Sequence, residues 1–170
     1  MATEDELKRA AAERALELVR PGMLVGLGTG TTARHFIAGV GRLVADGMQV
    51  SCLATSRASE TQARALGIPL VAELDRPIDL AVDGADEVDS ELRLIKGRGG
   101  AFFREKLVAE ASSRFVVVAE ESKLVPRLGA GVLPQRPRGA RSCRRCRRPP
   151  RFPCQGQAPP AAGSCQESAG

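Results

Sequence analysis

Apolar positions in the first 120 residues follow two different spacings along the chain. A helical spacing of three or four positions predicts helices over 3–19, 29–47, 56–67 and 99–112. Short apolar runs between them predict buried strands at 23–28, 48–55, 68–74, 78–83 and 114–120. Strands that alternate with helices of this length are joined by right-handed crossovers, which favour a parallel sheet. We therefore predict an α/β fold with an open, largely parallel sheet and helices on both faces.

Two of the predicted helices carry features that should fix their orientation. In the first, Thr3 and Glu6 have the spacing of a capping box. The apolar stripe of this helix is expected to consist of Leu7, Ala11, Ala15 and Leu18. In the helix over 99–112, the expected core stripe consists of Phe103, Leu107 and Ala111. Glu105 lies off that stripe, and the spacing alone does not distinguish a solvated helix carboxylate from a functional one.

The composition changes abruptly near residue 135. The chain has 170 residues and a net charge of +5, but eight of its 25 Lys and Arg residues lie in 135–170, with only one of its 20 Asp and Glu residues. That segment also holds six of the 11 Pro and four of the five Cys, and Phe152 is its one large apolar residue. Such a segment cannot bury enough apolar surface to offset the entropy of ordering it. We predict a folded domain over 1–134 and a disordered, Arg/Pro/Cys-rich tail over 135–170.

Several classes of protein and site are not expected. The chain has no apolar run of about 18 residues, and its N-terminus mixes both signs of charge, so a cytoplasmic protein without a membrane partner is expected. The arginines of the tail are not interleaved with aromatic residues, so no nucleic-acid partner is expected. The tail has one C-x-x-C pair at Cys143 and Cys146 but no second such pair and no nearby His, so no metal site is expected.

A glycine-rich loop, "VGLGTGTTA" at 25–33, joins a predicted strand to a predicted helix. Glycines at 26, 28 and 30 let the backbone approach an anion, and the amides of a helix N-terminus point toward it. Thr29, Thr31 and Thr32 add hydroxyl donors. The loop matches neither a P-loop nor G-x-G-x-x-G. Both a phosphate site and an ordinary glycine-rich turn remain open interpretations.

Acidic and basic residues follow two later strands. "DGADEVD" places Asp83, Asp86, Glu87 and Asp89 at the carboxyl end of a predicted strand. "LIKGRGGAFFREK" places Lys96 before a glycine-rich turn and Glu105 in the helix that follows. Ligands of open α/β sheets bind at the carboxyl ends of the strands, which favours an active site here. A solvated acidic loop and ordinary surface charges are the alternatives.

Five segments resemble one enzyme family. They are "VGLGTGTTARHFI", "ATSRASETQARALGIPL", "DLAVDGADEVD", "LIKGRGGAFFREKLVAE" and "VVVAEESKLV", in the order and spacing of the type A ribose-5-phosphate isomerases. The resemblance implies a Rossmann-like α/β fold, a homo-oligomer, and interconversion of D-ribose 5-phosphate and D-ribulose 5-phosphate through an enediolate in the pentose phosphate pathway. It implies a sugar phosphate as the small-molecule substrate, with no cofactor. We expect the family's second small domain to be missing, and we hypothesise a frameshift near Gln135.

The resemblance also assigns roles to particular residues. It implies that Glu105 is the general base that moves a proton between C2 and C1. It implies that Asp83 and Lys96 serve ring opening and stabilise the enediolate charge. The substrate-binding residues it implies are Thr29, Gly30, Thr31, Thr32, Asp83, Gly84, Ala85, Asp86, Lys96, Gly97, Arg98, Gly99 and Lys123. Lys8 is similar to a helix lysine that approaches the phosphate.

A different class of function is the main alternative to an isomerase. The chain could be a sugar-phosphate-binding pseudoenzyme or regulatory domain without turnover, although an intact Glu105 favours the enzyme. A weaker alternative is a basic-tailed nucleic-acid binder, whose affinity would fall steeply with salt. His35 is the only histidine and is expected to be structural, which argues against a Ser-His-Asp triad. Cys52 lies within a predicted strand and is expected to be a buried, inert thiol.

Overall fold

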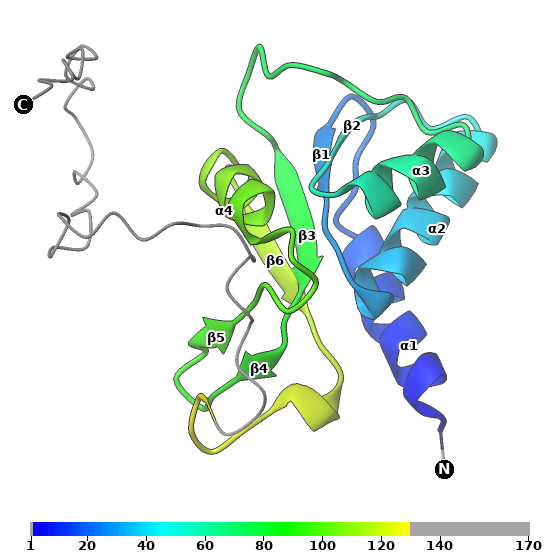
Figure 1. The fold of residues 1–170 in the computed structure, drawn as a ribbon. Helices are drawn as coiled ribbons and strands as arrows, with labels where there is room; N and C mark the ends of the chain where they lie inside the picture. The colour runs from blue at the N-terminus through cyan, green and yellow to red at the C-terminus, as the bar shows by residue number, and fades with distance from the viewer. Residues whose placement is uncertain (1, 130–170) are drawn as a thin grey trace, which may run out of the picture. The chain divides into compact units, whose positions relative to one another are not determined.

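The computed structural model describes residues 2–129, and the predicted tail lies outside them. Four strands of this part form one sheet in the order β2-β1-β3-β6 (Figure 1). They are β1 (Leu24–Leu27), β2 (Ser51–Ala54), β3 (Leu80–Gly84) and β6 (Phe115–Val118). Each pair of neighbours is parallel. The prediction of an open parallel sheet is therefore confirmed.

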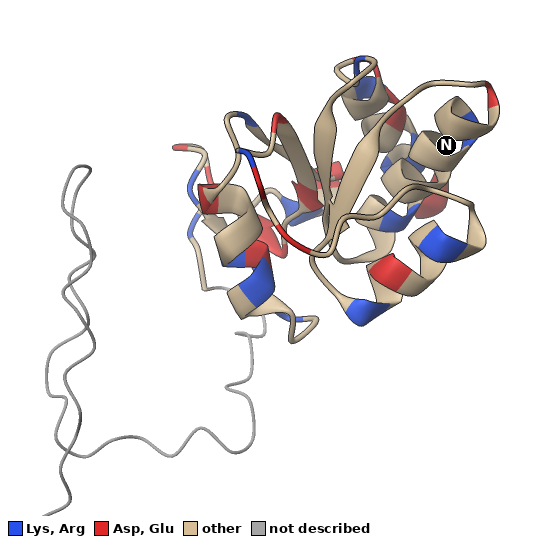
Figure 2. Ribbon diagram, turned by 90° about the horizontal axis from the view of Figure 1, so that it is seen from above, with Lys and Arg blue, Asp and Glu red and all other residues tan. Residues whose placement is uncertain are grey.

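Helices cover both faces of this sheet (Figure 1). The helices α1 (Glu4–Leu16), α2 (Thr31–Ala45) and α3 (Arg57–Ala65) lie on one side, and α4 (Phe102–Glu110) lies on the other. Acidic and basic residues are interspersed on the helices (Figure 2). No helix of residues 2–129 is long and apolar enough to cross a membrane.

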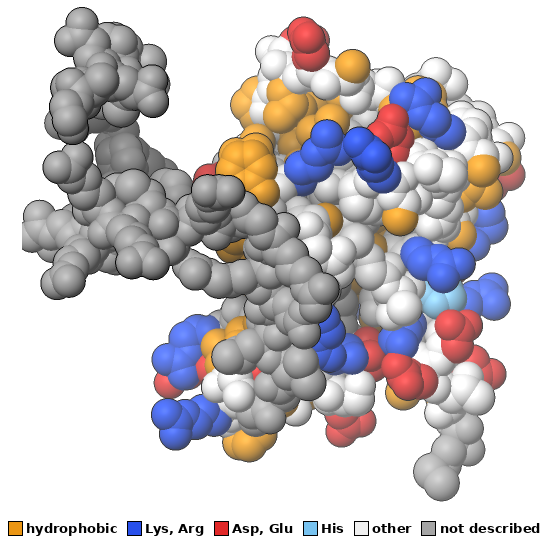
Figure 3. Space-filling model, in the orientation of Figure 1, with side chains coloured by type: hydrophobic (Ala, Val, Ile, Leu, Met, Phe, Trp, Pro, Cys, Tyr) orange, Lys and Arg blue, Asp and Glu red, His pale blue; other side chains and the backbone are white. Residues whose placement is uncertain are grey.

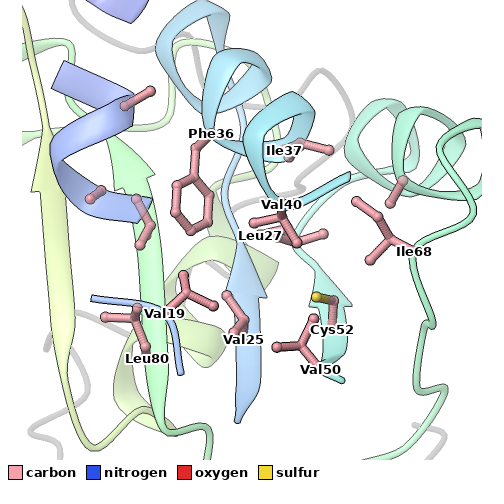
Figure 4. Packing of buried hydrophobic residues seen from close by; sticks show 14 of the residues in the cluster. Val19, Val25, Leu27, Phe36, Ile37, Val40, Val50, Cys52, Ile68 and Leu80 are labelled. Atoms are coloured by element: carbon pink, nitrogen blue, oxygen red, sulfur yellow. The ribbon is translucent and has the colours of Figure 1, made fainter. Parts of the chain in front are cut away.

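The sheet separates two apolar cores. In the larger one, side chains of α2 pack against β1 and β3, as Phe36, Val40 and Leu27 show (Figure 4). The smaller core joins Leu24 of β1 to Val108 of α4. Successive side chains of a strand point to opposite faces, so β1 contributes to both cores. The predicted inert thiol, Cys52, is fully buried in the larger core, and burial raises its pKa to about 12.

The first helix begins as predicted, and Ala11, Ala15 and Leu18 of its predicted stripe pack in the larger core. Thr3 and Glu6 form the predicted capping box, with the Thr3 hydroxyl accepting from the Glu6 amide. Leu7 is 44% exposed, however, so the predicted stripe is wrong at this position. The buried side of α1 consists of Lys8, Ala12 and Ala15. Lys8 can lie there because its ammonium group contacts two carboxylates.

The prediction for α4 is wrong in the same way and to a larger extent. Phe103 and Leu107 are 73% and 49% exposed, whereas Glu105 and Val108 are buried. Small residues in the sheet below let α4 approach closely through Val108. A Cβ added at Gly26 would lie 2.7 Å from Cγ1 of Val108. This contact turns Glu105 inward and leaves the aromatic residues outside.

One predicted strand is absent and two short ones were not predicted. The segment 68–74 forms only an isolated bridge between Leu70 and Cys52, because Pro69 has no N–H to extend a ladder. The strands β4 (Glu87–Val88) and β5 (Leu94–Ile95) form an antiparallel pair of their own. A 3₁₀ turn, η1 (Glu121–Lys123), follows β6. The strands β4 and β5 and the turn η1 extend the chain beyond the carboxyl ends of the main strands (Figure 1).

A candidate active site at the carboxyl ends of the strands

Three charged side chains that the sequence places in separate segments meet above β3. Asp83 lies in β3, Lys96 directly follows β5, and Glu105 lies in the first turn of α4. The Lys96 ammonium nitrogen is 2.9 Å from Oδ1 of Asp83 and 3.2 Å from Oε1 of Glu105. The side chains of Asp83 and Glu105 are only 4% and 5% exposed. One ammonium group is thus held between two buried carboxylates, which we call the Asp–Lys–Glu trio.

The glycine-rich loop fixes the position of Asp83. The backbone amides of Thr29 and Gly84 both donate to Oδ1 of Asp83, each at 2.8 Å. Gly28 makes this approach possible, because a Cβ at that position would lie 2.2 Å from the same oxygen. The Lys96 ammonium donates in turn to the carbonyl oxygen of Thr29 at 3.3 Å. The loop between β1 and α2 is therefore part of the site.

A second glycine-rich turn joins Lys96 to Glu105. Gly97 and Gly100 have φ values of 114° and 79°, which side-chain-bearing residues rarely adopt. The turn lets the chain reverse direction directly into α4. The backbone amide of Arg98 donates to Oδ2 of Asp86 at 2.9 Å. This bond ties the predicted substrate-binding turns 83–86 and 96–99 together.

The trio holds its carboxyl groups in an environment that favours proton uptake. Burial raises the pKa of Glu105, Lys96 opposes this effect, and the nearby Asp83 charge adds to it. Burial likewise raises the pKa of Asp83 against the opposing effects of Lys96 and the two backbone amides. Oε2 of Glu105 is buried and has no hydrogen-bond partner in the described part of the chain. Glu105 therefore combines a raised pKa with an oxygen that can accept a proton.

Other predicted substrate-binding residues form a second group around Glu120. Oε1 of Glu120 is 3.3 Å from the Lys123 ammonium nitrogen and 3.9 Å from that of Lys8. Oε2 accepts from the hydroxyl of Thr32 at 3.4 Å. Glu120 is not among the site residues predicted from the sequence. Its signal is an acid at the end of a predicted strand, three residues before Lys123 in "EESK".

There is open space beside the glycine-rich loop. A pocket of about 550 Å³ is lined by Thr29, Ser56, Gly99 and Phe103, among others. It lies between the loop that positions Asp83 and the turn that leads into α4. A larger pocket lies between α3 and α4, and it is lined by apolar residues such as Leu70 and Leu107 rather than by the trio.

Not every acidic residue of "DGADEVD" joins the trio. Asp89 accepts from Nε of Arg93 at 2.7 Å and closes the β4–β5 turn. Glu87 accepts from the amide of Gly129 at 2.6 Å. His35 lies 3.1 Å from Oδ1 of Asp5, a surface contact typical of the structural role expected for it. Within residues 2–129, no group of three or more His, Cys, Asp or Glu side chains is arranged to hold a metal ion.

The fold and the site together define a class of protein. It is a parallel α/β domain with a buried cluster of two carboxylates and a lysine at the carboxyl ends of its strands and a glycine-rich loop at a helix N-terminus. A family model for ribose 5-phosphate isomerase A (phosphoriboisomerase A) matches residues 51–135. The chain belongs to the ribose 5-phosphate isomerase A family.

Individual relatives agree with this assignment. The chain is 54% identical over 132 residues to ribose-5-phosphate isomerase A of Bradyrhizobium diazoefficiens, covering 76% of this chain and 54% of the relative. The fold is similar to a ribose 5-phosphate isomerase A structure from Methanocaldococcus jannaschii, with a TM-score of 0.72, 42% identity, and coverage of 75% and 58%. A D-ribose-5-phosphate isomerase in complex with phospho-erythronic acid also gives a TM-score of 0.72, at 39% identity and with coverage of 75% and 57%. The chain spans about half the length of the relatives it matches.

Proposed function

We propose that this protein is an aldose–ketose isomerase that interconverts D-ribose 5-phosphate and D-ribulose 5-phosphate in the non-oxidative pentose phosphate pathway. The observation that carries the proposal is the Asp–Lys–Glu trio, in which Lys96 lies between Asp83 and Glu105. The names of the relatives support the substrate. A similar structure was solved with phospho-erythronic acid, which supports a phosphorylated sugar-like ligand. No observation favours a pseudoenzyme or regulatory domain.

The proposed reaction moves one proton between neighbouring carbons. Oε2 of Glu105 takes the proton from C2 of the open-chain aldose, and the electrons of that C–H bond form the C1–C2 double bond. The carbonyl oxygen at C1 becomes the negatively charged oxygen of the enediolate. After a proton passes from the C2 oxygen to the C1 oxygen, Glu105 returns its proton to C1. The product has its carbonyl group at C2, and no oxidant or reductant is consumed.

Lys96 and Asp83 assist this transfer without a metal or an organic cofactor. The Lys96 ammonium lies next to Glu105, where the enediolate oxygens develop charge during proton transfer. A fixed positive charge at that point lowers the energy of the transition state. The carboxylate of Asp83 pairs with the same ammonium group of Lys96. We assign Asp83 a role in ring opening together with Lys96.

The phosphate would be held away from the reacting carbons. Thr29–Thr32 contribute hydroxyls and the amides at the start of α2, and Lys8 and Lys123 contribute positive charge nearby. Binding energy from such a remote group can be used to orient the sugar over Glu105. Gly84, Ala85, Gly97, Arg98 and Gly99 would line the sugar between these two ends.

An activity assay with a matched control tests the proposal. Purified protein should convert ribose 5-phosphate to ribulose 5-phosphate, and Glu105→Gln should lower kcat by about 10²–10⁴. Glu110→Gln is the control, since Glu110 lies on the same helix and pairs only with Lys106 among the contacts described. Equal rates in wild type and Glu105→Gln would overturn the base assignment. Binding of a phosphate ester without turnover would favour the pseudoenzyme.

We propose a cytoplasmic homo-oligomer whose isomerase domain is residues 1–134 and which binds no nucleic acid. The interspersed charges of the helices support a small-molecule partner over a nucleic acid (Figure 2). Cell fractionation and sedimentation analysis would test the location and the oligomeric state. The frameshift hypothesis concerns residues outside the described part and requires resequencing of the gene.

A further inference from the structure

Glu120 is a buried carboxylate that the proposed chemistry does not use. Its side chain is only 1% exposed, yet it lies at the same edge of the sheet as the trio. It follows β6, whose last residue, Val118, pairs with Gly84 of β3. Burying a carboxylate costs free energy unless charged or hydrogen-bonding groups surround it. The groups that surround Glu120 therefore indicate its purpose.

Four polar side chains from three different elements converge on Glu120. Oε1 faces the ammonium groups of Lys8 and Lys123 and the hydroxyl of Ser122, which lies 3.3 Å away. Oε2 faces the hydroxyl of Thr32 in the first turn of α2. Burial raises the pKa of Glu120, but its own backbone amide, Lys123 and Lys8 outweigh burial and hold the pKa below its usual value. Glu120 is therefore ionised at neutral pH and attracts both lysines to one oxygen atom.

Both lysines need a fixed partner because they come from opposite ends of the described sequence. Lys8 lies on the buried side of α1, and its closer partner, Glu4, is exposed. Lys123 lies in η1. Without Glu120, Lys123 would sample many rotamers and Lys8 would be held only by the exposed Glu4, so a ligand would have to order both side chains more fully. Glu120 has already ordered them beside the N-terminus of α2.

We propose that Glu120 is a positioning residue that holds Lys8 and Lys123 in place to receive the phosphate group of the substrate. The proposal rests on the proposed function for the identity of that substrate. It assigns Glu120 no contact with the reacting carbons. Loss of Glu120 should therefore weaken phosphate binding while leaving proton transfer at Glu105 largely intact.

Direct binding measurements test this role independently of turnover. Inorganic phosphate and ribose 5-phosphate would be titrated by calorimetry into wild type, Glu120→Gln and Glu121→Gln. Glu120→Gln should weaken both ligands about 5- to 10-fold, because two lysine side chains must then be ordered on binding. Glu121→Gln is the matched control, since it removes the same charge from the exposed neighbour and should change each Kd less than about twofold.

Steady-state kinetics adds a readout that a purely structural role would not produce. Glu120→Gln should raise KM for ribose 5-phosphate by the same factor as Kd, with kcat within about threefold of wild type. If the protein shows no isomerase activity, the phosphate titration still gives a result, so failure of the proposed function and failure of this inference are distinguishable.

Two results of the phosphate titration would overturn the inference. Phosphate binding that is unchanged or tighter in Glu120→Gln would mean that Glu120 only repels the anion. A wild type that does not bind phosphate would also refute the inference. Should Glu120→Gln fail to fold, Glu120→Asp keeps the charge but shortens the side chain and is expected to weaken phosphate about 2- to 4-fold. Wild-type affinity in Glu120→Asp would then contradict the proposal.

Discussion

Burial of the Glu105 carboxyl group lowers the stability of the folded chain. Its carboxyl group is buried, and one of its oxygens has no partner among residues 2–129. A buried acceptor without a partner typically costs about 1–3 kcal/mol. Such a cost is common where a side chain serves chemistry rather than stability. Burial also raises the pKa of Glu105, which affects both activity and stability as the pH changes.

The first prediction concerns the pH dependence of activity. The base must be ionised to accept a proton, so activity is lost as the pH falls through the pKa of Glu105. Burial raises that pKa above the usual value for glutamate, and the acid limb of kcat/KM against pH should shift upward with it. A pH–rate profile of the wild type measures the midpoint. An acid limb at or below the usual glutamate pKa would contradict the assignment of Glu105 as base.

The second prediction concerns stability. A carboxyl group whose pKa is raised by folding binds its proton more tightly in the folded state, so its contribution to stability falls as the pH rises through that pKa. Glu105→Gln mimics the protonated form. We expect its Tm at neutral pH to equal or exceed that of wild type, while kcat falls. A lower Tm in thermal melts would show that the charged pair with Lys96 stabilises the fold.

For single residues, the sequence predicted which side chains form the site better than it predicted their burial and their partners. It singled out Asp83, Lys96 and Glu105, and the structure brings them together. It did not predict that Glu105 would be buried, because helical spacing records apolar residues and not the lysine that compensates an acid. Glu120 was missed for the same reason, since its partners Lys8 and Thr32 are far away in the sequence.

Among the elements, α4 depends most on a single position in the sheet. A Cβ at Gly26 would meet Val108 at 2.7 Å and Ala81 at 2.8 Å, both closer than real Cβ contacts. The absence of a side chain at Gly26 thus sets the distance between α4 and β1. It also sets the position of Glu105, which α4 carries toward Lys96.

Gly26→Ala should therefore disturb both stability and activity. Overpacking of this kind costs about 1–3 kcal/mol, and the displaced helix should lower kcat although Gly26 touches no substrate. Urea unfolding and the isomerase assay measure the two effects. Gly84→Ala serves as the stability comparison, because its nearest atom, the Val118 carbonyl oxygen, lies 3.7 Å away. Adding Val108→Ala should restore part of the loss, and an absence of any recovery would argue against the steric cause.

The elements that sequence patterns missed are short or interrupted. The strands β4 and β5 have two residues each, too few for an alternating pattern to register. The segment 68–74 is apolar enough for a strand, but Pro69 prevents a continuous ladder. The strands β1 and β3 were predictable because every residue in them is buried, and α2 was predictable because seven of its residues are buried.

The described part of the molecule also exposes an apolar surface at α4. Phe102, Phe103 and Leu107 are all at least 49% exposed, and Figure 3 shows apolar side chains gathered beside this helix. Contiguous apolar patches of this kind promote association between molecules. We therefore expect this apolar surface of α4, rather than the net charge of the protein, to determine how strongly the molecules self-associate.

Leu107→Lys tests that expectation. The side chain is 49% exposed, so the substitution should change the free energy of unfolding by less than about 0.5 kcal/mol while reducing self-association in sedimentation velocity runs. Leu92→Gln is the control, since Leu92 is 82% exposed on the β4–β5 turn, apart from α4. Equal reductions in both variants would mean that general hydrophobicity, and not the surface of α4, drives association.

The two halves of the site differ in how far apart their parts lie along the chain. The three side chains of the trio come from one short stretch between residues 83 and 105, and their most distant described partner in the sequence is the backbone of Thr29. The cluster around Glu120 needs Lys8 from the first helix, and it forms only when the chain has closed over its full folded length. Fraying of α1 would therefore separate Lys8 from Glu120 while the Asp–Lys–Glu trio stayed assembled. Amide exchange should be faster in α1 than in β3, so the proposed phosphate site should be lost before the trio as the chain opens locally.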